Sequence, residues 1–245
     1  MKHLLIVFCF FLLANQIELM AQLPKPSNGR IVRIENFSSK YVPARNVDVW
    51  LPDNYTPSKK YAVLYMHDGQ MLFDSSITWN KQEWGVDETL TQLMQKKKIK
   101  DCIVVGIWNG GKSRHAEYFP QKPFEALSKE QQKLVYDAYR SGGQSIFSGL
   151  AISSDNYLKF LVEELKPYID KTYNTFTDQS NTFIAGSSMG GLISMYALCE
   201  YPTVFGGAAC MSTHWPGLLS MDNNPVHSVF FSYLKKHLPS PGQHQ

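Results

Sequence analysis

Hydrophobic and polar residues alternate along two early segments of the chain, residues 31–37 and 46–51. A period of two is typical of β-strands that bury one face and leave the other in water. We therefore expect these segments to form an antiparallel pair. Four later segments are continuously apolar and predict strands that are covered on both faces, namely residues 61–66, 102–108, 182–185 and 206–211.

Helical patterns lie between the apolar segments. Apolar residues recur at helical spacing over residues 86–94, 155–168, 192–200 and 226–237. Strands that alternate with helices predict an α/β protein with a mostly parallel sheet covered on both sides, and 245 residues suit one such domain. Residues 109–154 lack a clear period, so we expect a long loop over the carboxyl edge of the sheet, where such sheets bind ligands.

The first 21 residues form a different kind of segment. Lys2 precedes an apolar run over residues 4–14, and Ala21 offers a small side chain before Gln22. This pattern predicts a secretory signal peptide over residues 1–21 and a single domain over 22–245. The run is too short to span a bilayer comfortably, so we expect a secreted or periplasmic protein without a stable membrane span. An uncleaved anchor or a buried strand is the alternative.

Composition and charge exclude several partners. Hydrophobic residues make up 44% of the chain and charged residues 18%, a globular balance, and the formal net charge is only +3. The basic cluster at residues 96–100 suits a solvated helix end, so no nucleic-acid partner is expected. No Cys/His spacing resembles a zinc site, and we expect no metal or cofactor. The thiols of Cys102, Cys199 and Cys210 are expected to be buried, although one disulfide of unknown pairing remains an alternative.

The strongest chemical pattern is Gly186-Ser187-Ser188-Met189-Gly190. An apolar strand leads into it and a helical pattern leads out, as in the nucleophile elbow of serine hydrolases. Glycines allow the strand to turn sharply into the helix, so that the Ser188 hydroxyl projects from the apex. The Met189 amide then points at the oxyanion that forms on the substrate. The alternative is a glycine-rich turn with an incidental serine.

A second constellation follows the first buried strand. It contains His67, Asp68, Gly69 and Gln70. In such hydrolases the loop at this place supplies the second oxyanion donor, for which we expect the Gln70 amide, with that of Gly69 as the alternative. His67 precedes the nucleophile at a strand end, so we expect it to pack or hydrogen-bond within the loop and not to act as the general base.

These motifs, in this order, resemble the esterase D-like family of α/β hydrolases, which includes enterochelin, feruloyl and acetylxylan esterases and S-formylglutathione hydrolases. The segments that carry the resemblance are Tyr65-Met66-His67-Asp68-Gly69-Gln70-Met71-Leu72-Phe73-Asp74, Gly106-Ile107-Trp108-Asn109, Arg114, Glu117-Tyr118-Phe119-Pro120 and Gly186 to Gly191. The resemblance covers roughly residues 30–238. It is specific for the family and weak for the substrate.

The resemblance implies a three-layer α/β-hydrolase fold with Ser188 as the nucleophile and the amides of Gln70 and Met189 as the oxyanion hole. It also implies that residues 109–125 form part of the substrate pocket. The candidate pocket residues are His67, Asp68, Arg114, Glu117, Tyr118, His214 and Trp215. For Arg114, Glu117 and Tyr118, a salt bridge that stabilises the loop and an aromatic plug are an equally open interpretation.

The remaining triad members are not visible after Ser188. An α/β hydrolase places an acid and then a histidine on loops that follow later strands, whereas only one strand pattern, residues 206–211, follows here. His214 stands at the end of that strand and is a weak candidate base, with Trp215 as a hydrophobic wall. Asp222 and His227 have the right order but no strand between them. We therefore expect a C-terminally truncated domain whose sheet lacks its last one or two strands.

Two principal functions follow. The first is a secreted esterase that hydrolyses a small-molecule or carbohydrate-linked carboxylic ester through an acyl-enzyme on Ser188. The second is a catalytically silent fragment or ligand-binding pseudoenzyme, because loss of a triad member leaves only about 10³–10⁴-fold catalysis over water. A third and weaker alternative is a carbohydrate-binding surface built from Trp79, Trp84, Trp108 and Trp215.

Overall fold

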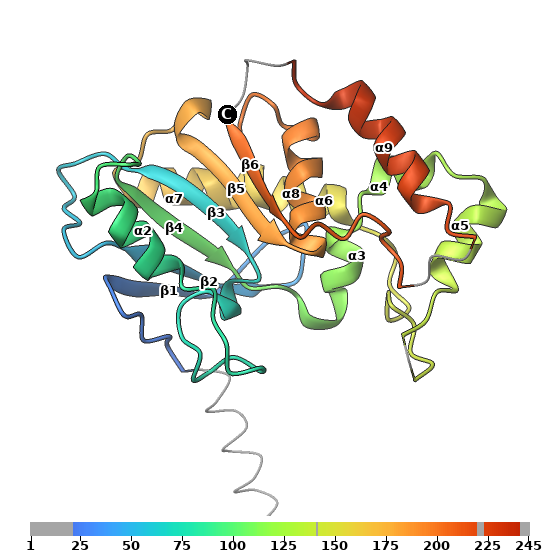
Figure 1. Cartoon of the computed structure of the whole chain (residues 1–245), viewed down its shortest axis with the longest axis horizontal. Coiled ribbons are helices and arrows are strands. Elements are labelled where there is room, and N and C mark those ends of the chain that lie inside the picture. Colours follow the sequence, from blue (N-terminus) through green and yellow to red (C-terminus); the bar gives the residue numbers. More distant parts are fainter. Residues whose placement is uncertain (1–21, 141, 220–222, 241–245) are drawn as a thin grey trace, which may run out of the picture.

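The computed structural model describes residues 22–140, 142–219 and 223–240, so the predicted signal peptide and Asp222 lie outside the described residues. Within these ranges the chain forms a six-stranded sheet of order β1-β2-β4-β3-β5-β6 (Figure 1). The strands are β1 (Arg30–Phe37), β2 (Arg45–Leu51), β3 (Ala62–His67), β4 (Cys102–Ile107), β5 (Thr182–Ser187) and β6 (Gly207–Met211). Strand β2 pairs antiparallel with β1 and β4, whereas β4, β3, β5 and β6 are mutually parallel. The predicted antiparallel pair and the mostly parallel sheet are confirmed.

Helices connect the parallel strands, as their spacing predicted. The helices are α2 (Val86–Gln95), α3 (Arg114–Tyr118), α4 (Gln121–Glu125), α5 (Lys129–Tyr136), α6 (Ser154–Lys159), α7 (Lys166–Thr172), α8 (Met189–Glu200) and α9 (Val226–His237). A π-helical segment, η3 (Phe160–Leu165), joins α6 to α7, and short 3₁₀ turns form η1 (Gly69–Met71), η2 (Gly111–Ser113) and η4 (Gln179–Asn181). The four predicted helices are therefore all present.

The expectation of an irregular loop over residues 109–154 is wrong in part. This region contains α3, α4 and α5, and the first two are only five residues long. A helix of little more than one turn cannot show a 3.6-residue period, so its contacts with other elements stabilise it more than its own sequence does. Only α5 carries a local signal, a capping box formed by Ser128 and Gln131.

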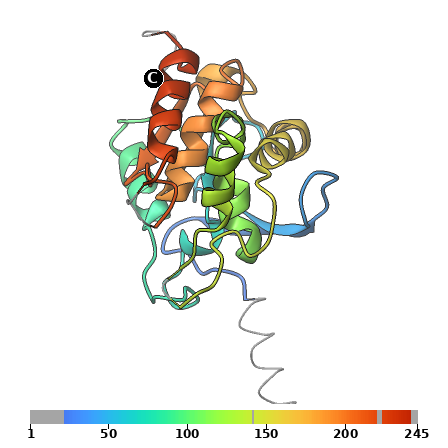
Figure 2. The same cartoon turned by 90° about the vertical axis from the view of Figure 1, so that its right-hand side faces the viewer.

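The sheet separates two apolar layers, and alternate residues of each inner strand enter opposite layers. On β3, Val63 and Tyr65 join the larger core with the apolar faces of η3, α7 and α8, whereas Met66 joins a smaller core beneath α2. This is the period of two expected for a pleated strand. Viewed from the side, α9 stands beside α8, so that the larger core extends beyond the sheet (Figure 2). Three layers result: α2, the sheet, and helices α6 to α8.

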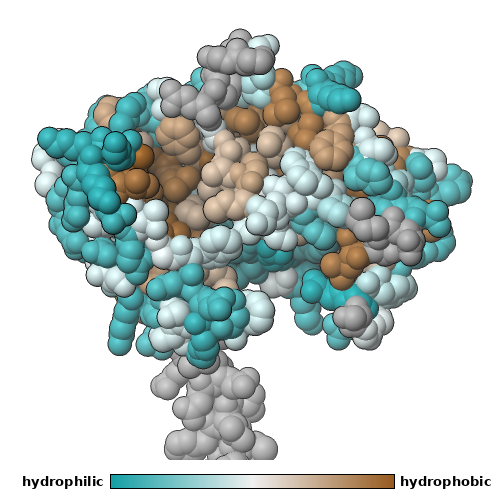
Figure 3. Space-filling view, in the orientation of Figure 1, coloured by the Kyte–Doolittle hydropathy of each residue, from teal (hydrophilic) through white to brown (hydrophobic). Residues whose placement is uncertain are grey.

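Strand β6 departs from its prediction as a strand buried on both faces. It is the edge strand of the described sheet, and its Ala209 is exposed. Apolar side chains gather on this face, where a groove of about 530 Å³ runs over β3, β5 and β6 (Figure 3). The groove is lined mainly by apolar residues, and the charged residues in its lining are Lys98 and Lys100. Burial on the opposite face, against α8, explains why the strand reads as apolar in sequence.

The described part of the chain was compared with the requirements for a membrane span, a metal site and a disulfide. No helix in it has the length and apolar character needed to cross a bilayer, and no cluster of three or more histidine, cysteine or acidic side chains could hold a metal ion. Cys102 and Cys199 are buried, Cys210 is half-buried, and none of the three forms a disulfide. Burial raises the pKa of the Cys102 thiol to about 12, as expected for a packed cysteine.

Candidate active site

Ser188 lies in the turn between β5 and α8 and has a strained backbone. Its dihedral angles are φ 57° and ψ −118°, a region that residues with a Cβ rarely adopt, and it is exposed to solvent. Three backbone hydrogen bonds hold it: its amide donates to Met211 O at 3.0 Å, and its carbonyl accepts from Leu192 N at 3.2 Å and His214 N at 3.1 Å. The surrounding backbone therefore imposes the conformation that points the side chain outward.

The glycines around Ser188 permit a close approach of strand and helix. A Cβ on Gly186 would lie 2.6 Å from the carbonyl carbon and oxygen of Gly190, which is closer than real Cβ atoms come to other groups. At Gly190 a Cβ would make ordinary contacts, at 3.4 Å, with His67 and Asp68. Steric exclusion of a side chain is therefore strict at Gly186 and mild at Gly190. The first turn of α8 also touches the loop after β3.

Two backbone amides in this region have no acceptor. Met189 begins α8 and Gln70 lies in η1, and within the described ranges neither N–H donates a hydrogen bond. The first amides of a helix have no partner inside it and attract anions. Gly69 is held against β4, since a Cβ there would lie 2.5 Å from Gly106. The Gln70 side chain accepts a hydrogen bond from Asn109 N at 3.2 Å.

His67 is 2% exposed and lies behind this loop. Its Nδ1 is 2.8 Å from the Tyr157 hydroxyl, and its ring packs 5.1 Å from that of Tyr118, centroid to centroid. Burial, reinforced by the charge of Arg114 and opposed by that of Asp68, lowers the pKa of His67 to about 4. The imidazole is therefore neutral at pH 7. It makes no hydrogen bond to Ser188 and supports the loop from inside.

Asp68 and Arg114 form a two-pronged ion pair. Arg114 Nε donates to Asp68 Oδ1 at 2.6 Å and Arg114 Nη2 to Oδ2 at 2.7 Å, while Asn109 Nδ2 donates to Oδ1 at 2.7 Å. Burial lowers the pKa of Arg114, but its hydrogen bonds with Asp68 outweigh this effect and raise it overall. The structure therefore brings these two predicted residues together, and the Arg114 guanidinium is bound to Asp68 through its Nε and Nη2 atoms.

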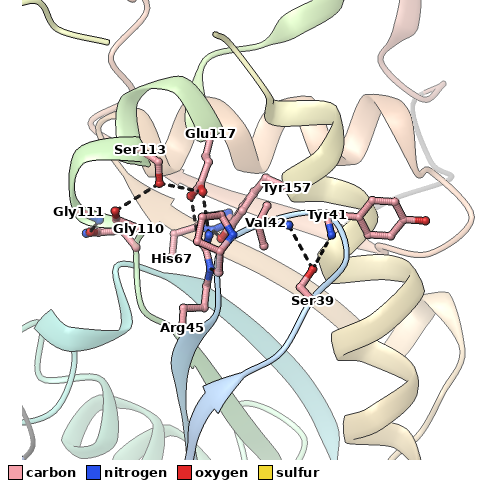
Figure 4. A network of polar contacts seen from close by, with 12 residues as sticks. Ser39, Tyr41, Val42, Arg45, His67, Gly110, Gly111, Ser113, Glu117 and Tyr157 are labelled. Atoms are coloured by element: carbon pink, nitrogen blue, oxygen red, sulfur yellow. Dashed lines mark hydrogen bonds and ion pairs between the residues drawn. The ribbon is translucent and has the colours of Figure 1, made fainter. Parts of the chain in front are cut away.

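Glu117 is placed in the interior, and the expectation that it lines an open pocket is not met. It is 1% exposed and receives hydrogen bonds from Arg45 Nη1 at 2.8 Å and Nη2 at 2.7 Å. Ser113 Oγ donates to the same carboxylate at 2.8 Å and also bonds to Gly110 O, which ties the η2 turn to it (Figure 4). The salt bridge that stabilises the loop exists, but it links Glu117 to β2 and not to Arg114.

Tyr118 is also buried, with 0% of its surface exposed. Its ring packs 5.2 Å from Tyr157, and burial raises the pKa of its hydroxyl well above the ordinary value. Arg114 lies over the same ring at 5.0 Å. Tyr118 therefore serves as the aromatic plug between His67 and Arg114, because it has no surface with which to touch a substrate in this conformation.

His214 and Trp215 lie near Ser188 but on the side of α9. The His214 amide bonds to Ser188 O, whereas its ring Nε2 is 3.1 Å from Leu218 O. Trp215 stacks on Phe231, with centroids 5.2 Å apart. No histidine nitrogen or carboxylate oxygen of the described residues is hydrogen-bonded to the Ser188 hydroxyl.

Three residues near the site were given no role by the sequence. Arg45 shares the inward face of β2 with Val47 and Val49, so an arginine at that period could have indicated a buried acidic partner. Asn109 belongs to the recognised motif but gained a role only through its bond to Asp68. His115 is 7% exposed and places Nε2 3.0 Å from Gly217 O. No local pattern signals that contact.

Comparison with known proteins decides the family. A family model described as "Putative esterase" matches residues 38–228. The chain belongs to this esterase family. The match includes β2 to β6, the loop after β3 and the Ser188 turn, and the α/β-hydrolase-like fold agrees with it.

Individual relatives are distant. The chain is 24% identical over 214 residues to the uncharacterised Bacillus subtilis protein YjcH, covering 87% of this chain and 71% of that protein. It is 26% identical over 200 residues to an endo-1,4-beta-xylanase/feruloyl esterase of Xylanibacter ruminicola, covering 79% of this chain and 22% of that protein.

A solved structure with a similar fold is the IroE-like serine hydrolase of Shewanella oneidensis, with a TM-score of 0.58 and 21% identity. The similarity covers 85% of this chain and 56% of that one. The chain thus spans little more than half the length of this serine hydrolase. At 21% identity, this similarity shows that the two chains share a fold and nothing further.

We expect Gly186→Ala to lower the free energy of unfolding by at least about 2 kcal/mol, because the new methyl group would overlap the backbone of Gly190. Gly190→Ala is the matched control, since its methyl group would make ordinary contacts and alanine favours a helix. Urea denaturation of both variants measures the difference. Equal stability of the two would contradict the strict steric role of Gly186.

We expect Glu117→Gln to cost about 3–5 kcal/mol, because it leaves the buried Arg45 guanidinium without its counter-ion. Lys133→Gln removes an exposed ion pair with Asp137 and should leave stability unchanged. Chemical denaturation compares the two variants with the parent protein. A small loss for Glu117→Gln would mean that Arg45 finds another partner or water.

Stability should fall as the pH is lowered from 7 to 5. The folded-state pKa of His67 is about 4 against an ordinary 6.5, so the unfolded chain binds more protons between these values and acid favours unfolding. Each such histidine contributes about 2 kcal/mol to this change, and His115, whose pKa burial also lowers to about 4, acts in the same direction.

The measurement is urea denaturation at pH 7 and pH 5. His67→Gln should reduce the pH-dependent loss relative to the parent protein. An unchanged pH dependence in His67→Gln would show that His67 is not kept neutral by the fold.

Proposed function

We propose that this chain is a serine esterase that hydrolyses a carboxylic ester through an acyl-enzyme on Ser188. The observation that carries the proposal is the exposed, strained Ser188 at the junction of β5 and α8, beside the unbonded Met189 amide. A serine in this turn presents its hydroxyl at the carboxyl edge of the sheet. Membership of the esterase family supports the same chemistry.

In the proposed reaction, Ser188 Oγ attacks the ester carbonyl carbon and the carbonyl oxygen becomes an oxyanion. We propose that the amides of Met189 and Gln70 donate to that oxyanion; Asp68, in the same loop as Gln70, lies against the first turn of α8. The bond from carbonyl carbon to alcohol oxygen then breaks, and the alcohol leaves with the proton lost by Ser188. Water attacks the acyl-enzyme, releases the acid and restores the hydroxyl.

A small-molecule or carbohydrate-linked ester is the substrate class we favour. Trp79 is 86% exposed on a loop whose base is tied to η1 by a hydrogen bond from Trp84 N to Met71 O at 3.1 Å. An exposed indole on that loop can stack on a sugar ring or an aromatic acyl group. The similarity to a xylanase/feruloyl esterase is consistent with this class. The apolar run at residues 4–14 supports a secreted or periplasmic location.

The alternative is a catalytically silent, ligand-binding member of the family. It is favoured by one observation: none of the described histidines or carboxylates is hydrogen-bonded to Ser188 Oγ. A serine hydroxyl without a base is a poor nucleophile at neutral pH. The two functions differ in the reactivity of Ser188, which can be measured directly.

The test is labelling of the folded protein with a fluorophosphonate probe, read by intact-protein mass spectrometry. An esterase should acquire one probe per chain, and Ser188→Ala should abolish the labelling. Ser187→Ala is the matched control, because this neighbouring serine ends β5 and should leave labelling unchanged. Folded protein that stays unlabelled would favour the silent alternative.

A further inference from the structure

Asp68 has a left-handed backbone conformation, with φ 57° and ψ 45°, immediately before the η1 turn. Aspartate tolerates this conformation better than most residues, but it still requires support. Support comes from the three hydrogen bonds that Arg114 and Asn109 donate to its carboxylate, and from its carbonyl, which accepts from Met71 N at 2.9 Å. The orientation of the next two amides, including that of Gln70, follows from this residue.

The Asp68 carboxylate also lies against the first turn of α8. Its Oδ2 is 3.4 Å from the position that a Cβ would take on Gly190, one residue after Met189. An uncompensated negative charge there would lower the positive potential of the helix N-terminus, which is where the proposed oxyanion would form. Arg114 supplies the compensating charge at 2.6–2.7 Å.

Arg114 is itself held on a rigid support. The helix α3 that carries it is tied to β2 through Glu117 and Arg45, and to the loop after β6 through His115 and Gly217. A planar guanidinium forms two parallel hydrogen bonds to a carboxylate. The anchored Arg114 therefore fixes the orientation of the Asp68 carboxylate and also neutralises its charge.

We propose that Arg114 is a positioning residue that fixes the Asp68–Gln70 loop and cancels the Asp68 charge at the first turn of α8, and that it does not bind substrate. The proposal rests on the proposed function for its chemical role. It predicts that removal of Arg114 does most harm while the Asp68 charge is still present, and that removal of that charge restores reactivity.

The experiment measures two quantities on the full chain: the rate constant for fluorophosphonate labelling of Ser188, and the hydrogen exchange of the segment 67–73. The variants are Arg114→Gln, Arg114→Lys, Asp68→Asn and the double variant Arg114→Gln/Asp68→Asn. Lys166→Gln is the matched control, because it breaks a similarly half-buried ion pair with Asp170 on α7.

Arg114→Gln should slow labelling at least about tenfold, whereas Arg114→Lys, which keeps the charge, should lose less. The double variant should return to within about threefold of Asp68→Asn alone. Exchange of the 67–73 segment should rise in Arg114→Gln and remain unchanged in Lys166→Gln.

Equal labelling of Arg114→Gln and the parent protein would overturn the proposal. A double variant as slow as Arg114→Gln would overturn the role of charge and leave a steric role only. If the parent protein does not label, the proposed function fails; the exchange measurement then still decides whether Arg114 positions the loop, because faster exchange in Arg114→Gln supports that role and unchanged exchange refutes it.

Discussion

The close approach of β5 and α8 is the constraint on which the rest of the site depends. The backbone of Gly190 lies where any side chain on Gly186 would have to be, so the chain can turn directly from strand to helix. That turn forces Ser188 into its strained conformation, and bonds from Ser188 to Met211 and His214 keep it there. The same turn leaves the Met189 amide without an acceptor among the residues that the structure describes. A strained, exposed hydroxyl and an unused amide therefore share one steric cause.

The short helix α3 links the neighbouring loops to this turn. Its Arg114 holds Asp68, its Glu117 holds Arg45 on β2, and its His115 contacts the loop after β6. Three charged or polar side chains within one helical turn thus connect three separate elements around the proposed oxyanion site. Two of the residues expected to touch substrate are buried: Glu117 binds Arg45, and Tyr118 packs between His67 and Arg114.

Local pattern predicted most of the framework. The alternation along β1 and β2 and the apolar runs of β3, β4 and β5 indicated the sheet, since strand periodicity survives any arrangement of neighbours. Prediction from local pattern failed where contacts between distant segments decide the structure. Helices α3 and α4 are too short to carry a period of their own. Strand β6 reads as a covered strand although only one of its faces is packed.

By itself, the sequence determined the class of fold, the Gly-Ser-Ser-Met-Gly turn and the loop after β3, because each of these follows from residues adjacent in the chain. Only the tertiary structure decided which charges meet. Arg114 pairs with Asp68, 46 positions away, and Glu117 with Arg45, 72 positions away. Ion pairs of this kind leave no periodic trace, since their partners are chosen by the packing of separate elements. For the same reason, the sequence alone could not show whether Glu117 and Tyr118 line a pocket or support the site from the interior.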